Sequence, residues 1–302
     1  MDNKQNSITI GCLCAIACEV LYGMSYMFTK QATDMASPFA LLGWRFLLSA
    51  IMMSILAFIG AIKINLTARK IKSLLLVSLF CPCIYFIAET FGIRHTTSSE
   101  SGVLLACIPV FSLITSAIIL RKYPTIFQIL GILISLIGVT ITVFAVGTSA
   151  SFSLVGYMLL MTAVFSYSIY GALVDKASEF SSLEITYIML IAGAVLFVIL
   201  AMVEAMIKGK FTELIILPFA EKKFLMVIVY QGIVCSVIAF FLSNMAISRI
   251  GLNRTASFIG ISTVVSILAG ALVLQETFTV YQIIGAIVII IGVYVSNFKA
   301  NI

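Results

Sequence analysis

The sequence has 302 residues, of which 62% are hydrophobic and 10% charged, and its formal net charge is +6. Soluble globular proteins carry about 25% charged residues, so this composition excludes a water-soluble protein. A helix of about 20 residues crosses the hydrocarbon core of a bilayer. Ten such helices take about 200 residues and leave about 100 for helix ends and loops, so little is expected to remain for a soluble domain. The positive charge then indicates orientation in the membrane and contact with lipid head groups, and excludes nucleic acid as a partner.

Ten apolar stretches follow one another along the chain, separated by short polar connections. Each is long enough to cross a bilayer, which predicts an all-α integral membrane protein with ten transmembrane helices. The predicted crossings are residues 8–29, 38–62, 73–93, 101–120, 125–146, 153–174, 184–206, 224–247, 254–274 and 279–297. The longest connection, at about 207–223, is expected to be a loop.

Lysine and arginine are unevenly distributed over the two ends of these helices. If the N-terminus is cytoplasmic, the connections on that side carry eleven of them and the opposite side six. Cytoplasmic loops are enriched in these residues. Both termini are therefore predicted to be cytoplasmic, in a multi-pass protein of the plasma membrane.

The two halves of the chain resemble each other. Residues 128–139 (QILGILISLIGV) align with 282–293 (QIIGAIVIIIGV), and Tyr22-Gly23 aligns with Tyr170-Gly171. The first alignment has an offset of 154 residues and the second an offset of 148. The difference of six residues fits an insertion in the loop before the eighth helix. Because five is an odd number, the second half enters the membrane from the opposite side. This predicts two inverted five-helix repeats, residues 1–149 and 150–302, an architecture typical of transporters with alternating access.

Several short motifs in a fixed order resemble the EamA family of the drug/metabolite transporter (DMT) superfamily. They are Tyr22-Gly23 followed by Lys30, Arg45-Phe46, Pro109-Val110-Phe111, and Gln275-Glu276-Thr277-Phe278-Thr279 before Gln282 and Gly285. The resemblance covers nearly the whole chain. It implies two five-helix inverted repeats and secondary-active movement of amino acids, amines or other small metabolites.

Glu19 lies near the middle of the first predicted helix, where an acidic residue costs about 2.5–3.5 kcal/mol to insert. Tyr22 and Tyr26 share its helical face, and a carboxylate beside aromatic rings suits an organic cation. The alternative is a protonated Glu19 hydrogen-bonded to a neighbouring helix. The repeat places Tyr167 over Glu19 and Tyr170 over Tyr22, so this pair is either an aromatic wall opposite the acid or ordinary core packing.

Glu89 repeats the pattern in the third predicted helix, with Tyr85 and Phe86 one turn before it. If Glu19 and Glu89 face one cavity, burial and mutual repulsion favour protonation of one of them. That carboxyl would then carry H+ during transport. The alternative is that Glu89 is solvated or paired with Arg94 near the outer surface.

Three further residues are candidates for the cavity or its gates: Arg45, Phe241 and Asn244. Arg45 lies about one and a half turns into the second helix and is expected to snorkel to the outer interface, or to pair with a carboxylate. Phe240, Ser262, Thr263 and Ser266 are weaker candidates of the same kind.

Glycines recur at a spacing of seven on one face of the fifth and tenth predicted helices. They are Gly131 and Gly138, and Gly285 and Gly292. Small residues let helix backbones approach closely. The glycines therefore indicate packing within the monomer or a contact in a homodimer.

The seven cysteines all lie inside apolar stretches, where a thiol behaves as a small hydrophobic group. Cys12 and Cys14, or Cys81 and Cys83, point to different sides of a helix, and the one histidine, His95, lies elsewhere. Neither a disulfide framework nor a metal site is predicted, and no other cofactor is.

These observations together predict a secondary-active transporter that moves a small organic solute across the membrane by alternating access. An organic cation or amine, such as choline, is favoured because the buried charges found are acids flanked by aromatic rings, and coupling to H+ is expected. An amino-acid exporter or a general metabolite or drug exporter of the same family is the alternative. An integral membrane enzyme acting on a lipid-linked substrate is disfavoured, because the loops bring together no convergent acid, base or metal groups. A channel is the third option.

Overall fold

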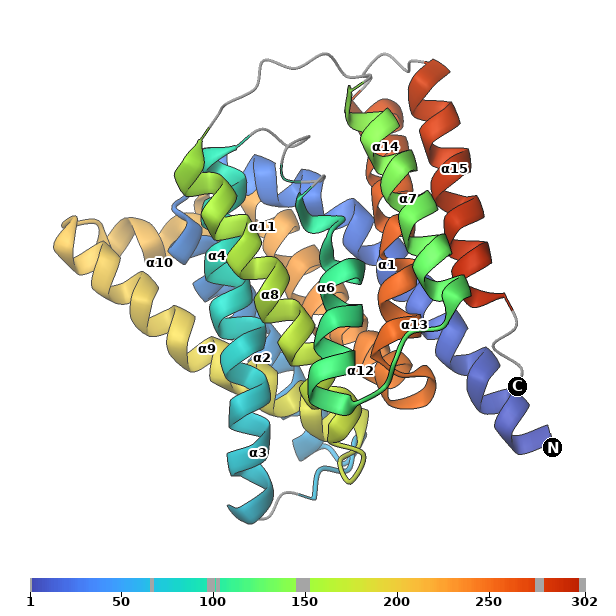
Figure 1. The fold of residues 1–302 in the computed structure, drawn as a ribbon. Coiled ribbons are helices and arrows are strands. Elements are labelled where there is room, and N and C mark those ends of the chain that lie inside the picture. Colours follow the sequence, from blue (N-terminus) through green and yellow to red (C-terminus); the bar gives the residue numbers. More distant parts are fainter. Residues whose placement is uncertain are drawn as a thin grey trace.

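The computed structural model describes residues 2–65, 68–96, 101, 104–144, 153–274 and 280–298. Within these residues the regular structure is entirely helical, which confirms the all-α class. Helix α1 begins and helix α15 ends on the same side of the molecule (Figure 1).

Most of the described helices lie within the predicted apolar stretches, and several of these stretches are built from two or three consecutive segments. In chain order they are α1 (Asp2–Met35), α2 (Pro38–Phe58), α3 (Ala68–Ser78), η1 (Leu79–Ile84), α4 (Tyr85–His95), α6 (Ile108–Thr115), η2 (Ser116–Leu120), α7 (Ile126–Phe144), α8 (Leu154–Lys176), α9 (Ser182–Ile207), α10 (Phe211–Ala220), α11 (Lys222–Val229), η3 (Tyr230–Ala239), α12 (Phe240–Ile250), α13 (Leu252–Ala256), η4 (Ser257–Ile259), α14 (Gly260–Leu274) and α15 (Val280–Asn297). Segments η1, η2 and η3 are π-helical and η4 is a 3₁₀ turn.

Six of these helical runs are long and apolar enough to cross a membrane. They are Gln5–Met35, Pro38–Phe58, Ile71–His95, Leu154–Lys176, Ser182–Ile207 and Lys222–Ile250. The shorter apolar helices in the described part of the chain are Ile108–Leu120, Ile126–Ile141, Phe211–Ala220 and Ile283–Asn297. The chain is therefore a multi-pass membrane protein.

Side chains placed at the helix starts explain where several helices begin. Ser37 accepts a hydrogen bond from the backbone N–H of Ala40 at 3.2 Å, directly before the helix-initiating Pro38. Ser181 and Glu184 form a reciprocal capping box at the start of α9. Both arrangements satisfy N–H groups that a helix leaves unpaired at its first turn.

The expectation of a loop over 207–223 is wrong, because Phe211–Ala220 forms helix α10. The indole N–H of Trp44 in α2 donates to the carbonyl of Leu214 at 2.9 Å and fastens α10 to the bundle. Ile215 and Ile216 stay exposed. Figure 1 shows α10 at the margin of the molecule, beside the end of α9.

The glycine faces of α7 and α15 pack against each other within the monomer. A Cβ atom added to Gly138 would lie 2.7 Å from the carbonyl oxygen of Gly285 and 2.7 Å from the backbone nitrogen of Ile289. Gly131 and Gly292 approach each other in the same way. This decides between the two interpretations of the glycine pattern, because the contact lies within one chain.

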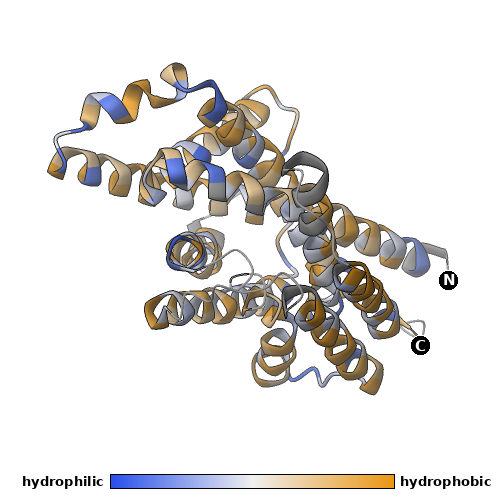
Figure 2. Ribbon diagram, turned by 90° about the horizontal axis from the view of Figure 1, so that it is seen from above, coloured by the Kyte–Doolittle hydropathy of each residue, from blue (hydrophilic) through white to orange (hydrophobic). Residues whose placement is uncertain are grey.

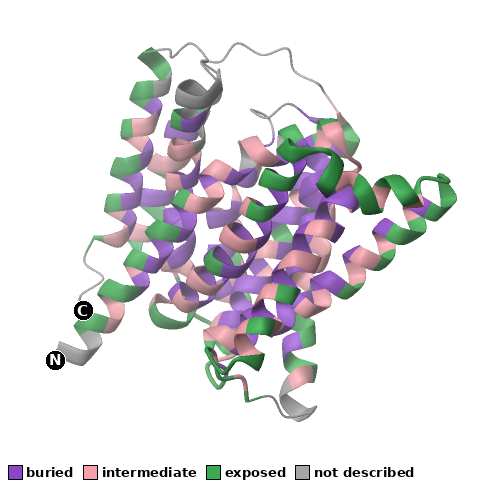
Figure 3. Ribbon diagram, turned by 180° about the vertical axis from the view of Figure 1, so that it is seen from behind, coloured by how far each residue is buried: buried purple, intermediate pink, exposed green. Residues whose placement is uncertain are grey.

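Apolar side chains cover both the inside and much of the outside of the molecule. Figure 2 shows hydrophobic residues over most of the helical surface, with hydrophilic ones gathered mainly near helix ends. Figure 3 shows the buried residues concentrated where the central helices cross. Exposed residues such as Ile137 and Ile287 on α7 and α15 are suited to contact lipid.

Candidate functional site

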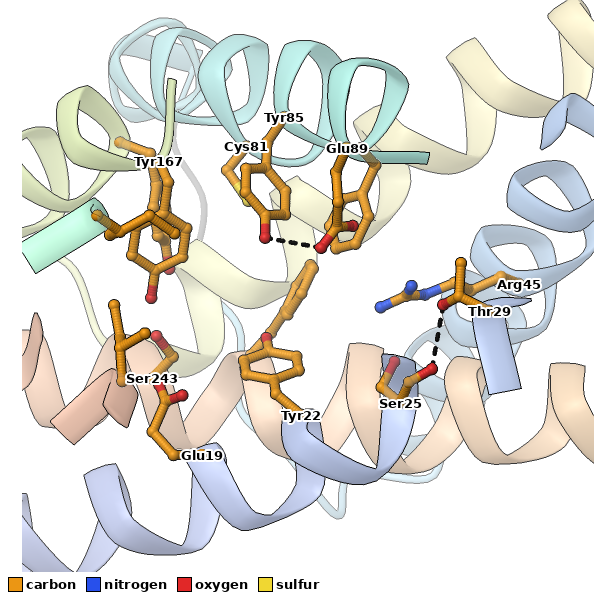
Figure 4. Close-up of a pocket in the computed structure, with 15 residues that line it drawn as sticks. Glu19, Tyr22, Ser25, Thr29, Arg45, Cys81, Tyr85, Glu89, Tyr167 and Ser243 are labelled. Carbon is orange, nitrogen blue, oxygen red and sulfur yellow. Dashed lines mark hydrogen bonds between the residues drawn. The ribbon is translucent and has the colours of Figure 1, made fainter. Parts of the chain in front are cut away.

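A cavity lies within the bundle, bordered by α1, α2, η1, α4, α6, α8, α12 and η4 (Figure 4). Its lining residues are Glu19, Tyr22, Ser25, Thr29, Arg45, Cys81, Tyr85, Phe86, Glu89, Ile108, Tyr167, Tyr170, Phe240, Ser243 and Ile259. Both halves of the chain contribute. The predicted residues Glu19, Tyr22, Arg45, Tyr85, Glu89, Tyr167 and Tyr170 all belong to this one cavity.

Glu19 projects from α1 into the cavity and is only 5% exposed. Ser262 lies near its carboxyl group, and the Ser262 hydroxyl donates to the Ile259 carbonyl oxygen at 2.7 Å. Among the residues that the structure describes, Glu19 forms no ion pair with a lysine or arginine. A buried carboxylate needs a compensating positive charge or a proton, so the site is suited to bind one or the other here.

Tyrosine rings form the wall facing Glu19. The ring centroids of Tyr167 and Tyr170, both from α8, are 5.4 Å apart, and those of Tyr85 and Tyr167 are 5.5 Å apart. Tyr22 follows Glu19 by one turn of α1 and packs against Phe240 at 6.4 Å. Tyr26 belongs to α1, but its side chain lies outside the described part of the structure.

Glu89 is also buried, at 7% exposure, and enters the same cavity from α4. The hydroxyl of Tyr85, one turn earlier, donates to Glu89 Oε1 at 2.9 Å. The alternative of a solvated Glu89 near Arg94 is therefore wrong, because Arg94 is exposed while Glu89 points inward. Two carboxyl groups thus line one cavity.

Arg45 does not snorkel to the interface, so that expectation is wrong. It is 3% exposed, and its Nε donates to Ser236 Oγ at 2.8 Å. Its guanidinium lies 4.4 Å from the ring centroid of Phe86, a cation–π arrangement. Figure 4 shows Arg45 and Glu19 on opposite sides of Tyr22. The physical reason is that buried partners from η3 replace the water that the guanidinium would otherwise need.

Phe241 and Asn244 are not among the residues lining the cavity, whereas Phe240 is. Asn244 is fully buried behind the cavity wall, where its Oδ1 accepts from the Tyr170 hydroxyl at 2.6 Å and its amide donates to Thr186 at 2.9 Å. In this conformation it holds the Tyr170 ring in place from behind the cavity wall.

The sequence analysis missed the polar residues that surround Arg45. Gln231 is fully buried, and its amide nitrogen donates to Thr29 Oγ1 at 2.7 Å, while its oxygen accepts from Arg45 at 3.4 Å. Ser25 lies one turn before Thr29 on α1. The sequence did hold a signal for Ser25 and Thr29. From Glu19 and Tyr22, helical spacings of three and four residues along α1 lead to these two side chains.

Two of the helices at the site change their helical geometry within the membrane. The π-helical segment η1 precedes Tyr85 and includes Cys81, whose φ and ψ of −139° and 120° are not helical. Segment η3, in the corresponding crossing of the second half, supplies Gln231 and Ser236. Such π-helical turns are frequent at functional sites, and broken helices mark the substrate sites of transporters built from repeats.

The central cavity is contracted in this conformation. Its volume is about 40 Å³, and one water molecule needs roughly 10–15 Å³ by the same kind of measure. The cavity therefore has room for a few water molecules only. The helices around it have to move apart before an organic solute is bound.

A polar cavity with buried charges, enclosed by membrane-spanning helices, is characteristic of a membrane transport protein. The model of the EamA-like transporter family matches residues 9–144 and matches again at 154–298. The chain therefore belongs to the EamA-like transporter family, which confirms the resemblance found in the sequence, and it has the two-repeat architecture of that family.

Similar proteins agree with this placement. "Uncharacterized transporter YcxC" of Bacillus subtilis (strain 168) is 32% identical over 287 residues, covering 94% of this chain and 92% of the relative. "Uncharacterized transporter YetK" of the same organism is 24% identical over 288 residues, covering 94% and 85%. A solved crystal structure with a TM-score of 0.75 and 15% identity covers 96% of this chain and 99% of its own, which shows a shared fold.

Proposed function

We propose that this chain is a secondary-active transporter that moves a small organic solute carrying an amine or quaternary ammonium group. The observation that carries the proposal is Glu19, a buried carboxyl group without a basic partner among the described residues. A positively charged group on the solute would supply the missing charge.

The proposed topology has ten crossings in two inverted repeats, residues 1–149 and 150–302, with both termini in the cytoplasm. The family match over two halves supports the repeat, and the shared side of the α1 start and the α15 end supports an even number of crossings. The excess of lysine and arginine on that side supports the orientation.

In the proposed binding mode, the solute ammonium group lies against Glu19 and the rings of Tyr22, Tyr167 and Tyr170. Aromatic faces attract a desolvated cation, with estimates from about 0.5 to above 2 kcal/mol per contact. A quaternary ammonium group cannot donate hydrogen bonds and therefore depends on this attraction. Choline-like solutes fit this description.

A zwitterionic solute such as an amino acid is the second candidate, and Arg45 is the observation that favours it. Its guanidinium lines the same cavity, on the other side of Tyr22 from Glu19. A solute with an ammonium group at one end and a carboxylate at the other would match both charges. Glu89 also lines this cavity, so it competes with such a carboxylate for the guanidinium.

We further propose that H+ couples transport through Glu19. When no solute is bound, a proton neutralises the buried carboxyl group, and the arriving ammonium group displaces it. Proton and solute would then occupy the site alternately, which is the requirement for exchange transport.

Ligand-dependent thermal stabilisation of the purified protein tests the site. A ligand that binds the folded state raises its stability by RT ln(1 + [L]/Kd). Quaternary amines, primary amines, amino acids and organic anions are compared on the wild type, on Glu19→Gln and on Glu179→Gln, an exposed acidic residue after α8 that serves as the matched control. We expect amines to stabilise the wild type and Glu179→Gln but not Glu19→Gln. Stabilisation by amines that survives in Glu19→Gln would contradict the proposed site.

A further inference from the structure

A second, wider cavity lies at the end of the bundle where α1, α4 and α9 finish and α2 begins. Its volume is about 380 Å³, far larger than the central cavity. Charged side chains of both signs line it: Asp34, Glu204 and Glu213, and Arg94, Lys208 and Lys210. Two of the pairs are joined as Glu204–Lys208 at 2.6 Å and Lys210–Glu213 at 2.9 Å.

The two cavities share three helices. On each of them, one residue lines the central cavity and a nearby residue lines the second cavity. These pairs are Thr29 and Thr33 on α1, Arg45 and Ala40 on α2, and Glu89 and Arg94 on α4, with the residue of the central cavity given first. Each pair is four or five residues apart, which is about 6–8 Å along a helix. The second cavity is therefore in line with the central one, displaced by a little more than one helical turn.

A polar seam on α1 connects the two cavities. Ser25, Thr29 and Thr33 follow one another at intervals of four residues and thus lie on one helical face. Ser25 and Thr29 line the central cavity, and Thr33 lines the second one. A solute that follows this seam would meet hydroxyl groups throughout.

Gln231 lies across this seam. Its side chain comes from η3 and is fully buried, and its amide nitrogen is 2.7 Å from Thr29 Oγ1 and 3.4 Å from the Ser25 carbonyl oxygen. Arg45 holds it from the other side, at 3.4 Å. The amide therefore joins α1, α2 and η3 between the two cavities.

We infer that the second cavity is the vestibule of the solute pathway, and that the hydrogen bond between Gln231 and Thr29 is a gate closing it off from the central cavity. The inference rests on the proposed function and adds a second binding site to it. In the vestibule, the carboxylate of Asp34 would receive the same ammonium-bearing solute before the gate opens, because it forms none of the ion pairs found among the described residues.

Cys81 provides a native reporter for this pathway, because it lines the central cavity and is 3% exposed. The probe is a membrane-impermeant methanethiosulfonate with a trimethylammonium group. It is applied separately to each face of the membrane, and modification of Cys81 is followed by peptide mass spectrometry. The variant Lys208→Cys, at the vestibule rim, identifies the face on which the vestibule opens.

Two variants break the gate independently: Gln231→Ala removes the donor, and Thr29→Val removes the acceptor with little change of shape. Losing one buried hydrogen bond shifts the equilibrium between the closed and the open gate by about three- to tenfold. We therefore expect the rate of Cys81 modification to rise by about that factor when the probe is applied to the vestibule face. Cys18, which is buried outside the cavity lining, should stay unmodified, and this controls for general loosening.

Blocking the vestibule completes the test. In the Thr29→Val background, Thr33→Trp should return the rate at Cys81 to the wild-type value, whereas Gln31→Trp, an exposed position on the same helix, should not. An unchanged rate in both gate variants, a rise confined to the opposite face, or equal rates with both tryptophans would overturn the inference. The labelling needs no solute, so its failure is distinguishable from failure of the Glu19 site.

Discussion

Replacing Gly138 by alanine tests the packing of α7 on α15. The added Cβ would lie 2.7 Å from the Gly285 carbonyl oxygen and 2.7 Å from the Ile289 nitrogen, whereas ordinary contacts begin at 3.4 Å. The shortfall is 0.7 Å, the difference of these two distances, and both obstructing atoms are backbone atoms that cannot turn aside. Overpacking of this kind costs about 1–3 kcal/mol, and the better helix propensity of alanine returns up to about 1 kcal/mol. We expect a net loss of about 1–2 kcal/mol.

Equilibrium unfolding by titration with sodium dodecyl sulfate, followed by circular dichroism in mixed micelles, measures this change. The matched control is Ile137→Ala, the neighbouring residue on α7, whose side chain is 57% exposed. The control should change stability by less than about 0.5 kcal/mol, and neither variant should change the oligomeric state. A neutral Gly138→Ala, or one that alters only self-association, would refute packing within the monomer.

Two further contacts make predictions for the same unfolding assay. Lys122 and Asp175 form an ion pair at 2.6 Å, and the lysine side chain is 58% exposed. Asp175 also accepts from the buried backbone N–H of Leu252 at 2.9 Å, so Asp175→Ala should lower the free energy of unfolding more than Lys122→Ala does; equal losses would contradict this. Trp44→Phe should cost about 0.5–1.5 kcal/mol through the lost bond to Leu214 and should increase proteolysis of α10; an unchanged cleavage rate would show that Trp44 does not fasten that helix.

The sequence predicted the helices well because a bilayer imposes a minimum length on every apolar stretch. The same minimum length explains why helix α10 was not predicted. At ten residues, Phe211–Ala220 is too short to be read as a crossing. The structure shows what fastens it to the bundle: Trp44 donates to the Leu214 carbonyl, and Leu217 packs against the buried cluster that contains Leu41 and Phe224.

The candidate site was predictable where burial is costly. Glu19 and Glu89 stand out because acids are rare within apolar stretches, and the helical spacing then indicated Tyr22 and Tyr85. The position of Arg45 was not predictable, because Ser236, which receives its hydrogen bond, is 191 residues away in the sequence. Gln231 was missed because a single amide in an apolar stretch does not reveal its partners.

Solute counterflow in proteoliposomes tests the central claim most directly. Vesicles containing the wild type, Glu19→Gln or Glu179→Gln are loaded with the amine that best stabilises the protein and are then exposed to its radiolabelled form. The account predicts saturable accumulation with the wild type and with Glu179→Gln, and a loss of at least about tenfold with Glu19→Gln, which corresponds to about 1.4 kcal/mol. Accumulation that is unaffected by Glu19→Gln, or uptake that rises linearly with concentration, would contradict it.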